Sequence, residues 1–249
     1  MSRRLLVVLI ALVGTAGVVV AGLALFFPEK DTTTLAQPGP VRSLEVDVEV
    51  GRIEVVPGGA DEATITRTRR YLIGAPKVSE ALVEGVLRVE AECQSAIAAG
   101  CAVDYRLEVP AGVPVRIRTE RGRVVVTDMT GTVEVDAGAG NVRLTRTRGP
   151  VKVDTSAGNV DGVDLAAQFL DATTSGGRIR LSIAEAPGRL GLKTGAGNID
   201  VGLPTAPGGY RVATETGAGK VDVTVEQNEG GSRAIIASTG AGNIRIHPR

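Results

Sequence analysis

Apolar and polar residues alternate with period two along residues 113–249, in a phrase that recurs seven times. Each copy has a glycine, a polar residue, and then two mostly apolar positions that flank a polar one, as in Gly140-Asn-Val142-Arg-Leu144. The first apolar column is β-branched in every copy, and such alternation predicts a strand with one buried face. The aligned glycines, which we predict to form turns, are Gly122, Gly140, Gly158, Gly177, Gly197, Gly219 and Gly242.

A second short apolar strand lies between successive copies, for example Val133-Glu-Val135. One period therefore holds two strands and two turns, which is one coil of a β-solenoid, and a repeat of this size must stack on its neighbours to bury its apolar face. We predict an all-β, single-domain β-solenoid of about seven or eight short coils over residues 113–249. Residues 41–112 are expected to supply N-terminal strands and a cap, with 64–91 and 103–109 forming the cap.

Small and polar residues define the corner between the two strands of a coil. Glycine and asparagine both tolerate positive φ, so we expect them to share this corner for that reason. Recurring threonines and asparagines beside it are expected to form hydroxyl and amide ladders between coils. We expect Ile246 to end the stack, with His247-Pro248-Arg249 protecting the open edge.

The N-terminus carries a long apolar run. Residues 5–27 contain no charge and would extend about 34 Å as a helix, enough to cross a bilayer core. Arg3 and Arg4 precede the run, which favours a cytoplasmic tail at 1–4 and an extracytoplasmic domain. We predict a single-pass membrane protein with a stalk or linker at residues 28–40; a cleaved signal peptide is the alternative.

Cys93 and Cys101 are the two cysteines of the chain and bracket one loop. In an exported domain such a pair is typical of a disulfide, which is what we predict.

These features resemble a bacterial family of unknown function that is labelled "putative adhesin". The resemblance rests on Cys93 and Cys101, on the following Val109-Pro-Ala-Gly-Val-Pro114, and on the series from Gly122 to Gly242. It covers about residues 41–249. It implies a β-solenoid, often with an N-terminal membrane segment, and it brings no catalytic or binding residues with it.

The composition offers little for catalysis. The 28 basic residues balance 28 acidic ones, so no net field favours nucleic acid. His247 is the one histidine and lies at the C-terminus, and the Cys and His counts do not support a metal site. The corners carry Asn, Arg or Lys where a calcium-binding turn needs acidic ligands, and no dinucleotide loop is complete. We therefore expect no cofactor and no metal.

Paired carboxylates are the remaining enzymatic possibility. Asp136, Asp154 and Asp171 recur near the corners, as in solenoid enzymes that cut polysaccharides. Aromatic platforms for sugar rings are scarce, so we interpret these residues as solvated carboxylates and expect no hydrolase activity.

Two function classes remain. The first is a non-catalytic, adhesin-like surface module that contacts an envelope polymer or a protein. The second is an envelope sensor that docks on a membrane partner. The sequence does not identify the ligand.

Overall fold

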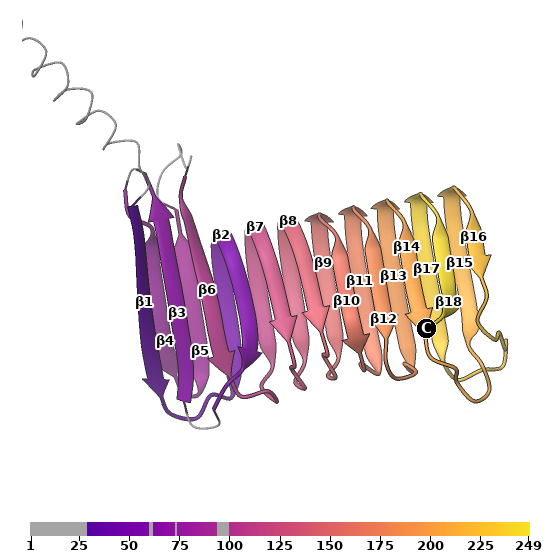
Figure 1. The fold of residues 1–249 in the computed structure, drawn as a ribbon, viewed down its shortest axis with the longest axis horizontal. Coiled ribbons are helices and arrows are strands. Elements are labelled where there is room, and N and C mark those ends of the chain that lie inside the picture. Colours follow the sequence, from indigo (N-terminus) through magenta and orange to yellow (C-terminus); the bar gives the residue numbers. More distant parts are fainter. Residues whose placement is uncertain (1–28, 60–61, 73, 94–99) are drawn as a thin grey trace, which may run out of the picture.

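The fold is built from β-strands alone. The computed structural model describes residues 29–59, 62–72, 74–93 and 100–249, and within them it contains 18 strands and no helix. The predicted segment 5–27 lies outside these residues, and none of the described chain forms a helix suited to crossing a membrane. The strands form one continuous mixed sheet that is folded into a rod of stacked coils (Figure 1). The all-β prediction is confirmed.

Each coil contributes one strand to each of two faces of the rod. Three long strands bend through the corner and belong to both faces: β2 (Ser43–Pro57), β7 (Val115–Thr127) and β8 (Val133–Thr145). The first face continues with β9 (Val151–Ala157), β11 (Phe169–Gly176), β13 (Arg189–Ala196), β15 (Arg211–Ala218) and β17 (Ala234–Ala241). The second face continues with β10 (Val160–Leu165), β12 (Ile179–Ile183), β14 (Ile199–Leu203), β16 (Val221–Val223) and β18 (Ile244–Pro248).

The coils stack in parallel and in register, so each apolar column of the repeat becomes a continuous core. Val142 pairs with Val124 on one side and with Val160 on the other, and all three side chains are buried. Period-two alternation in the sequence therefore corresponds to alternation between the interior and the solvent.

The second apolar column has one gap, at Gly162, and the side chain of Leu165 from the same strand fills this space. A Cβ at Gly162 would lie 2.5 Å from Leu165 Cδ1 and 2.7 Å from Leu181 Cδ2. Asp164 adopts positive φ (55°), and the register shifts between Gly162 and Leu165. This irregularity turns the Leu165 side chain into the space that a larger residue would occupy in the other coils.

The last two coils do not stack in chain order, which the sequence analysis did not predict. β17 pairs with β13 on one side and with β15 on the other, and β18 lies in the same way between β14 and β16. The C-terminal coil is thus inserted, and β15 and β16 form the end of the rod (Figure 1). Ile246 is buried inside the stack, so our expectation that it ends the stack is wrong; Val221 of β16 is 44% exposed instead.

The other end of the rod is closed by antiparallel strands. β5 (Val86–Glu92) and β6 (Ala102–Val109) pair in parallel with β2 and complete one more coil. Residues 86–91 and 103–109 therefore belong to a coil and not, as expected, to the cap. The cap consists of β4 (Lys77–Val83), antiparallel to β5, and β3 (Glu62–Tyr71), antiparallel to β6.

A polar cluster lies where the cap meets the core. Arg67 Nη1 donates to both oxygens of Glu80, at 2.7 and 2.8 Å, and the Tyr105 hydroxyl donates to Glu80 Oε1 at 2.8 Å. The three residues come from β3, β4 and β6, so the cluster joins the two faces across the interior. Burial, followed by the Glu80 carboxylate, raises the pKa of Tyr105.

The segment expected to be a stalk contains a strand. β1 (Glu29–Pro38) pairs antiparallel with β3 along its whole length. Thr32 and Thr34 lie opposite Thr68 and Thr66, with hydroxyl oxygens 3.1 and 3.4 Å apart. Threonine favours strands, and here two threonines of β1 lie opposite two threonines of β3 on the solvent-facing side. The composition of residues 28–40 did not suggest this pairing.

Candidate functional site

The corner is held by close backbone packing. The seven predicted turn glycines lie in one column, in which a Cβ on any member would lie well inside van der Waals contact of the carbonyl oxygen of a neighbouring glycine. Gly51 begins this column, below Gly122. Within the part of the chain that the structure describes, the non-glycine residues with positive φ are Glu84, Asp128, Arg146 and Asp164. The corner asparagines do not have positive φ, so the reason that we expected for their place at the corner is wrong.

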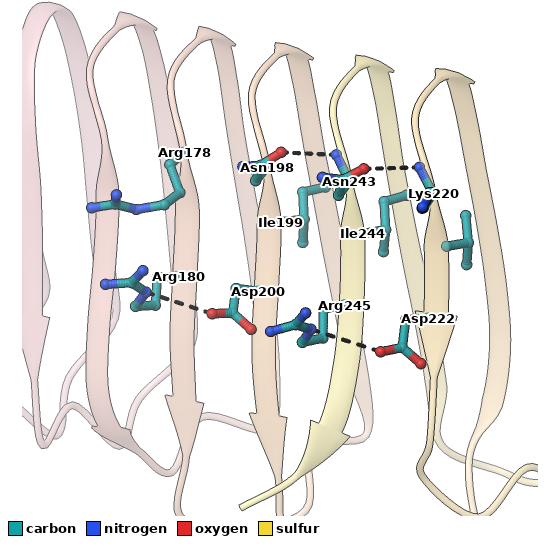
Figure 2. Close-up of a pocket in the computed structure, with 11 residues that line it drawn as sticks. Arg178, Arg180, Asn198, Ile199, Asp200, Lys220, Asp222, Asn243, Ile244 and Arg245 are labelled. Carbon is teal, nitrogen blue, oxygen red and sulfur yellow. Dashed lines mark hydrogen bonds and ion pairs between the residues drawn. The ribbon is translucent and has the colours of Figure 1, made fainter.

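The four corner asparagines and four of the six threonines beside the corner form hydrogen bonds with the backbone of the neighbouring coil; Thr119 donates within its own coil, and Thr155 Oγ1 is buried without a partner. Thr194 Oγ1 donates to the carbonyl of Gly177 at 2.9 Å, and Thr239 Oγ1 donates to that of Gly197 at 3.0 Å. Asn198 Oδ1 accepts from the Asn243 backbone N–H at 2.8 Å, and Asn243 Oδ1 accepts from that of Lys220 at 2.9 Å (Figure 2). We expected ladders of hydroxyl and amide groups between the coils. In the structure, the hydrogen bonds between coils join these side chains to backbone groups.

The asparagines belong to a row that runs along the second face next to the corner; its carboxylate is Asp104 of β6, which adjoins Arg52 and accepts the Arg52 backbone N–H at 2.9 Å, and the part from β2 to β16 has none. We call it the basic stripe, and it comprises, in spatial order, Arg52, Arg123, Asn141, Asn159, Arg178, Asn198, Asn243 and Lys220. Seven intervals of about 4.8 Å make the stripe about 34 Å long. Arg123 and Lys220 have no side-chain partner among the described residues, so their charges are available.

The next row of solvent-facing side chains on the second face, two residues further from the corner, alternates in charge. From β8 to β16 it reads Arg143, Asp161, Arg180, Asp200, Arg245 and Asp222. Arg180 Nε lies 3.6 Å from Asp200, and Arg245 Nε lies 3.7 Å from Asp222 (Figure 2). These long ion pairs between exposed groups leave the cations accessible to a ligand.

The two rows border a hollow of about 500 Å³ over β12, β14, β18 and β16. Its rim carries four cations, Arg178, Arg180, Lys220 and Arg245, against two carboxylates (Figure 2). Arg178 Nη2 lies 3.8 Å from Asp161, and the guanidinium is partly exposed at the rim, although its Nε is buried. The hollow therefore has the charge and the donors to hold an anionic group.

A second open hollow, of about 530 Å³, lies at the other end of the stripe. Its charged lining residues are Arg52, Arg70, Arg121, Arg123 and Asp104. Arg70 donates to Asp104 at 2.7 Å, which leaves a positive excess.

The opposite side of this corner, on the first face, is acidic. The hollow there is lined by Asp47, Glu49, Glu92 and Glu120. The corner thus separates a basic side from an acidic side near β1, even though the chain as a whole has no net charge.

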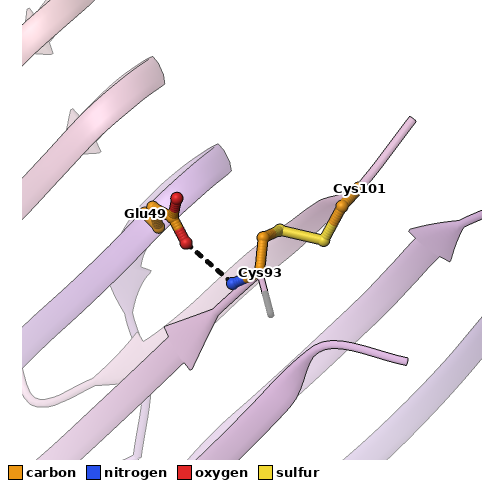
Figure 3. The surroundings of a disulfide bond; sticks show 3 residues. All are labelled: Glu49, Cys93 and Cys101. Atoms are coloured by element: carbon orange, nitrogen blue, oxygen red, sulfur yellow. Dashed lines mark hydrogen bonds between the residues drawn. A yellow bond between two sulfur atoms is a disulfide. The ribbon is translucent and has the colours of Figure 1, made fainter. Parts of the chain in front are cut away.

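The predicted disulfide is present in this region. Cys93 and Cys101 are bonded, with their Cα atoms 6.1 Å apart, and the Cys93 N–H donates to Glu49 Oε2 at 2.7 Å (Figure 3). The bond connects the end of β5 to the start of β6, where the other coils have their glycine corner. Residues 94–99 of this loop lie outside the described residues.

The carboxylates considered for catalysis do not form one constellation. Asp136 and Asp154 are in register, but Asp171 is in register with Lys152. Asp154 lies 3.2 Å from Lys152, and Asp171 lies 4.0 Å from Arg189.

His247 is held by its neighbours. Its Nε2 lies 3.3 Å from Asp200, and its Nδ1 lies 2.8 Å from the Pro248 carbonyl. Among the described residues, no group of three or more His, Cys, Asp or Glu side chains could hold a metal ion.

The sequence analysis did not identify the basic stripe. Its signal was present, because the position after each corner glycine is Arg, Asn or Lys in every copy. We interpreted these residues as solvent-facing, and the order of the last two coils was needed to place Asn243 beside Asn198.

Comparisons with known proteins place the chain in a family. A model of the family described as Toastrack DUF4097 matches residues 113–247. A comparison with curated proteins gives no match.

Similar solved structures include a "putative adhesin" from Bacteroides fragilis, with 11% identity, a TM-score of 0.42 and coverage of 89% of this chain and 99% of that one. A "putative cell adhesion protein" from Clostridium sporogenes has 11% identity, a TM-score of 0.37 and coverage of 89% and 100%. A "putative adhesin" from Parabacteroides merdae has 11% identity, a TM-score of 0.32 and coverage of 86% and 96%. Because the family model matches more than half of the sequence, the chain belongs to the Toastrack DUF4097 family.

Proposed function

We propose that this protein is a non-catalytic binding module, held at a membrane by residues 5–27, that contacts an anionic partner through the basic stripe. The observation that carries the proposal is the stripe itself: the eight successive coils from β2 to β16 place only Arg, Lys and Asn beside the corner, and Asp104 follows in the coil of β5 and β6. The asparagines are committed to the backbone through Oδ1, but each retains Nδ2 as an outward donor. Cations and amide donors at regular spacing suit a ligand with repeated acidic groups.

The tether is supported by the uncharged run at 5–27 and by the two arginines before it. In that arrangement the rod is extracytoplasmic, where the disulfide between Cys93 and Cys101 is chemically stable. A surface position and a binding face without a catalytic constellation together favour an adhesin-like module.

Retention on an immobilised polyanion tests the proposal. The full chain, purified in detergent, is applied to dextran sulfate and to uncharged dextran at low and high salt. We expect retention on dextran sulfate alone, decreasing with salt because exposed charges are screened. The test variant replaces the four stripe cations, Arg52, Arg123, Arg178 and Lys220, by serine.

A matched control removes the same charge from the first face, by replacing Lys77, Arg118, Lys193 and Arg211 with serine. Loss of retention in the stripe variant and retention of the control supports the proposal. Equal loss in both variants would reduce the effect to net charge and contradict it. Co-purification of a stoichiometric membrane protein, with no polyanion retention, would instead assign a docking role in envelope sensing.

A further inference from the structure

We propose that the corner edge of the rod lies against the membrane, with the basic stripe in contact with anionic phospholipid headgroups. The rod then lies along the bilayer and does not project from it. This inference rests on the tether of the proposed function and names the partner of the same stripe.

The first argument is the short connection between the predicted span and the fold. The span ends at Phe27 and β1 begins at Glu29, which leaves Pro28 alone between them. At no more than about 3.6 Å per residue, two steps hold the start of β1 within about 7 Å of the end of the span. The 13-residue stalk that would have separated the rod from the bilayer is replaced by a strand.

The second argument is where β1 begins. Lys30 pairs with Arg70, and Arg70 pairs with Ala102 at the start of β6. A Cβ on Gly51, the first corner glycine, would contact the backbone of Val103. The start of β1 therefore lies level with the glycine corner, at one end of the edge along which the stripe runs (Figure 1).

The third argument is the shape of the edge. The crest, by which we mean the outermost residue at the corner of each coil, consists of small exposed residues over most of the rod. From β8 onward its members are Ala139, Ala157, Gly176, Ala196, Ala241 and Ala218. Arg121 occupies this position in β7, but from β8 onward no long side chain stands on the crest, so this part can approach a flat surface closely.

The fourth argument is charge. Near β1, the hollow on the second-face side of the corner is lined by Arg52, Arg70, Arg121 and Arg123 against the single carboxylate of Asp104, and the stripe continues with Arg178 and Lys220. The first-face side carries Asp47, Glu49, Glu92 and Glu120. An anionic surface attracts the first set and repels the second, so the rod is expected to lean on its second face. Each basic residue near such a surface strengthens contact about fivefold.

Fluorescence quenching in nanodiscs tests this orientation. The full chain is labelled at a cysteine introduced on the crest, Ala196→Cys, or on the exposed opposite edge, Glu185→Cys. Each is inserted into phosphatidylcholine nanodiscs with or without phosphatidylglycerol, both containing a lipid with a spin label on its headgroup. We expect strong quenching of the Ala196→Cys label in the anionic discs, at least about fivefold less in neutral discs or at high salt, and none of the Glu185→Cys label.

Stripe and control variants connect the result to the residues. The four-serine stripe variant should lose the quenching of the crest label, whereas the four-serine first-face variant should keep it. Equal quenching of both labels, or quenching that is indifferent to lipid charge, would overturn the inference. So would crest labels that respond to added dextran sulfate but not to phosphatidylglycerol, because the stripe would then bind a soluble polymer.

Carbonate extraction of membranes separates failure of the inference from failure of the tether. A chain that is extracted by carbonate has no membrane span, and the proposed tether is then wrong. A chain that resists extraction but shows no crest quenching keeps the tether and contradicts the edge-on orientation alone.

Discussion

Single residues at the corner decide whether coils can approach each other. Gly140 lies in the glycine column without adopting positive φ, so its requirement comes from the neighbouring backbone alone. The sequence predicted the position of this glycine, but the reason, contact with the Gly122 carbonyl, depends on the stacked coil.

Gly140→Ala is therefore expected to destabilise the protein, by about 3 kcal/mol, because the added methyl group must displace the backbone of the next coil. Gly176→Ala is the matched control, since a Cβ there meets nothing within 4 Å. Urea unfolding of both variants measures the difference. Equal effects of the two substitutions would show that the close approach at the column does not limit packing.

Tyr105 gives a second test at this scale, through pH. Burial and the Glu80 carboxylate raise the pKa of its phenol above the value of about 10 expected in the unfolded chain. The folded state therefore holds this proton more tightly, and the contribution to stability is complete below pH 10 and lost as the pH rises through the folded-state pKa.

Stability of the wild-type protein should decrease above pH 10 by about 1.4 kcal/mol per pH unit from this group. Tyr105→Phe should lower that slope while leaving the contribution of Tyr210, whose pKa burial also raises. Denaturant unfolding at several pH values above 9 provides the measurement. An unchanged slope in Tyr105→Phe would mean that the phenol is not buried with Glu80.

At the scale of elements, regular alternation was predictable and its irregularities were not. The repeat identified both strands of a coil, because buried β-branched columns need only local periodicity. Leu165 was not recognised as core, since it stands out of register with the column that it fills. The pairing of β1 was also missed, because an edge strand whose partners lie 24 to 42 residues away leaves little local pattern.

A double-mutant cycle tests how the Gly162 gap is filled. Leu165→Ala should cost about 2–5 kcal/mol by leaving a cavity, and Gly162→Val about 1–3 kcal/mol by overpacking against Leu165. Because each change removes the problem created by the other, the double variant should be more stable than the sum of the single effects by more than about 1 kcal/mol. Additive effects would contradict the shared space, and thermal or urea unfolding of the four proteins decides the matter.

At the scale of the whole molecule, the stacking of coils was predictable but their order was not. In chain order Asp200 would lie beside Asp222, whereas the inserted coil places Arg245 between them. The insertion also lets the Asn243 backbone N–H donate to Asn198 Oδ1 on one side, while Asn243 Oδ1 accepts from the Lys220 backbone N–H on the other. Lys220, whose side chain has no acceptor for a further coil, then lies at the end of the row. Like charges opposite each other destabilise a sheet, so these contacts favour the observed order.

The coil order is the central claim, because the stripe and the alternating row both depend on it, and disulfide trapping tests it directly. Lys193 is in register with Ser238, and Ser238 with Glu215. Lys193→Cys/Ser238→Cys should cross-link on oxidation, since adjacent strands lie about 4.8 Å apart, whereas Lys193→Cys/Glu215→Cys should not, since two intervals exceed the reach of a disulfide. Efficient cross-linking of the second pair and not the first would contradict the inserted coil.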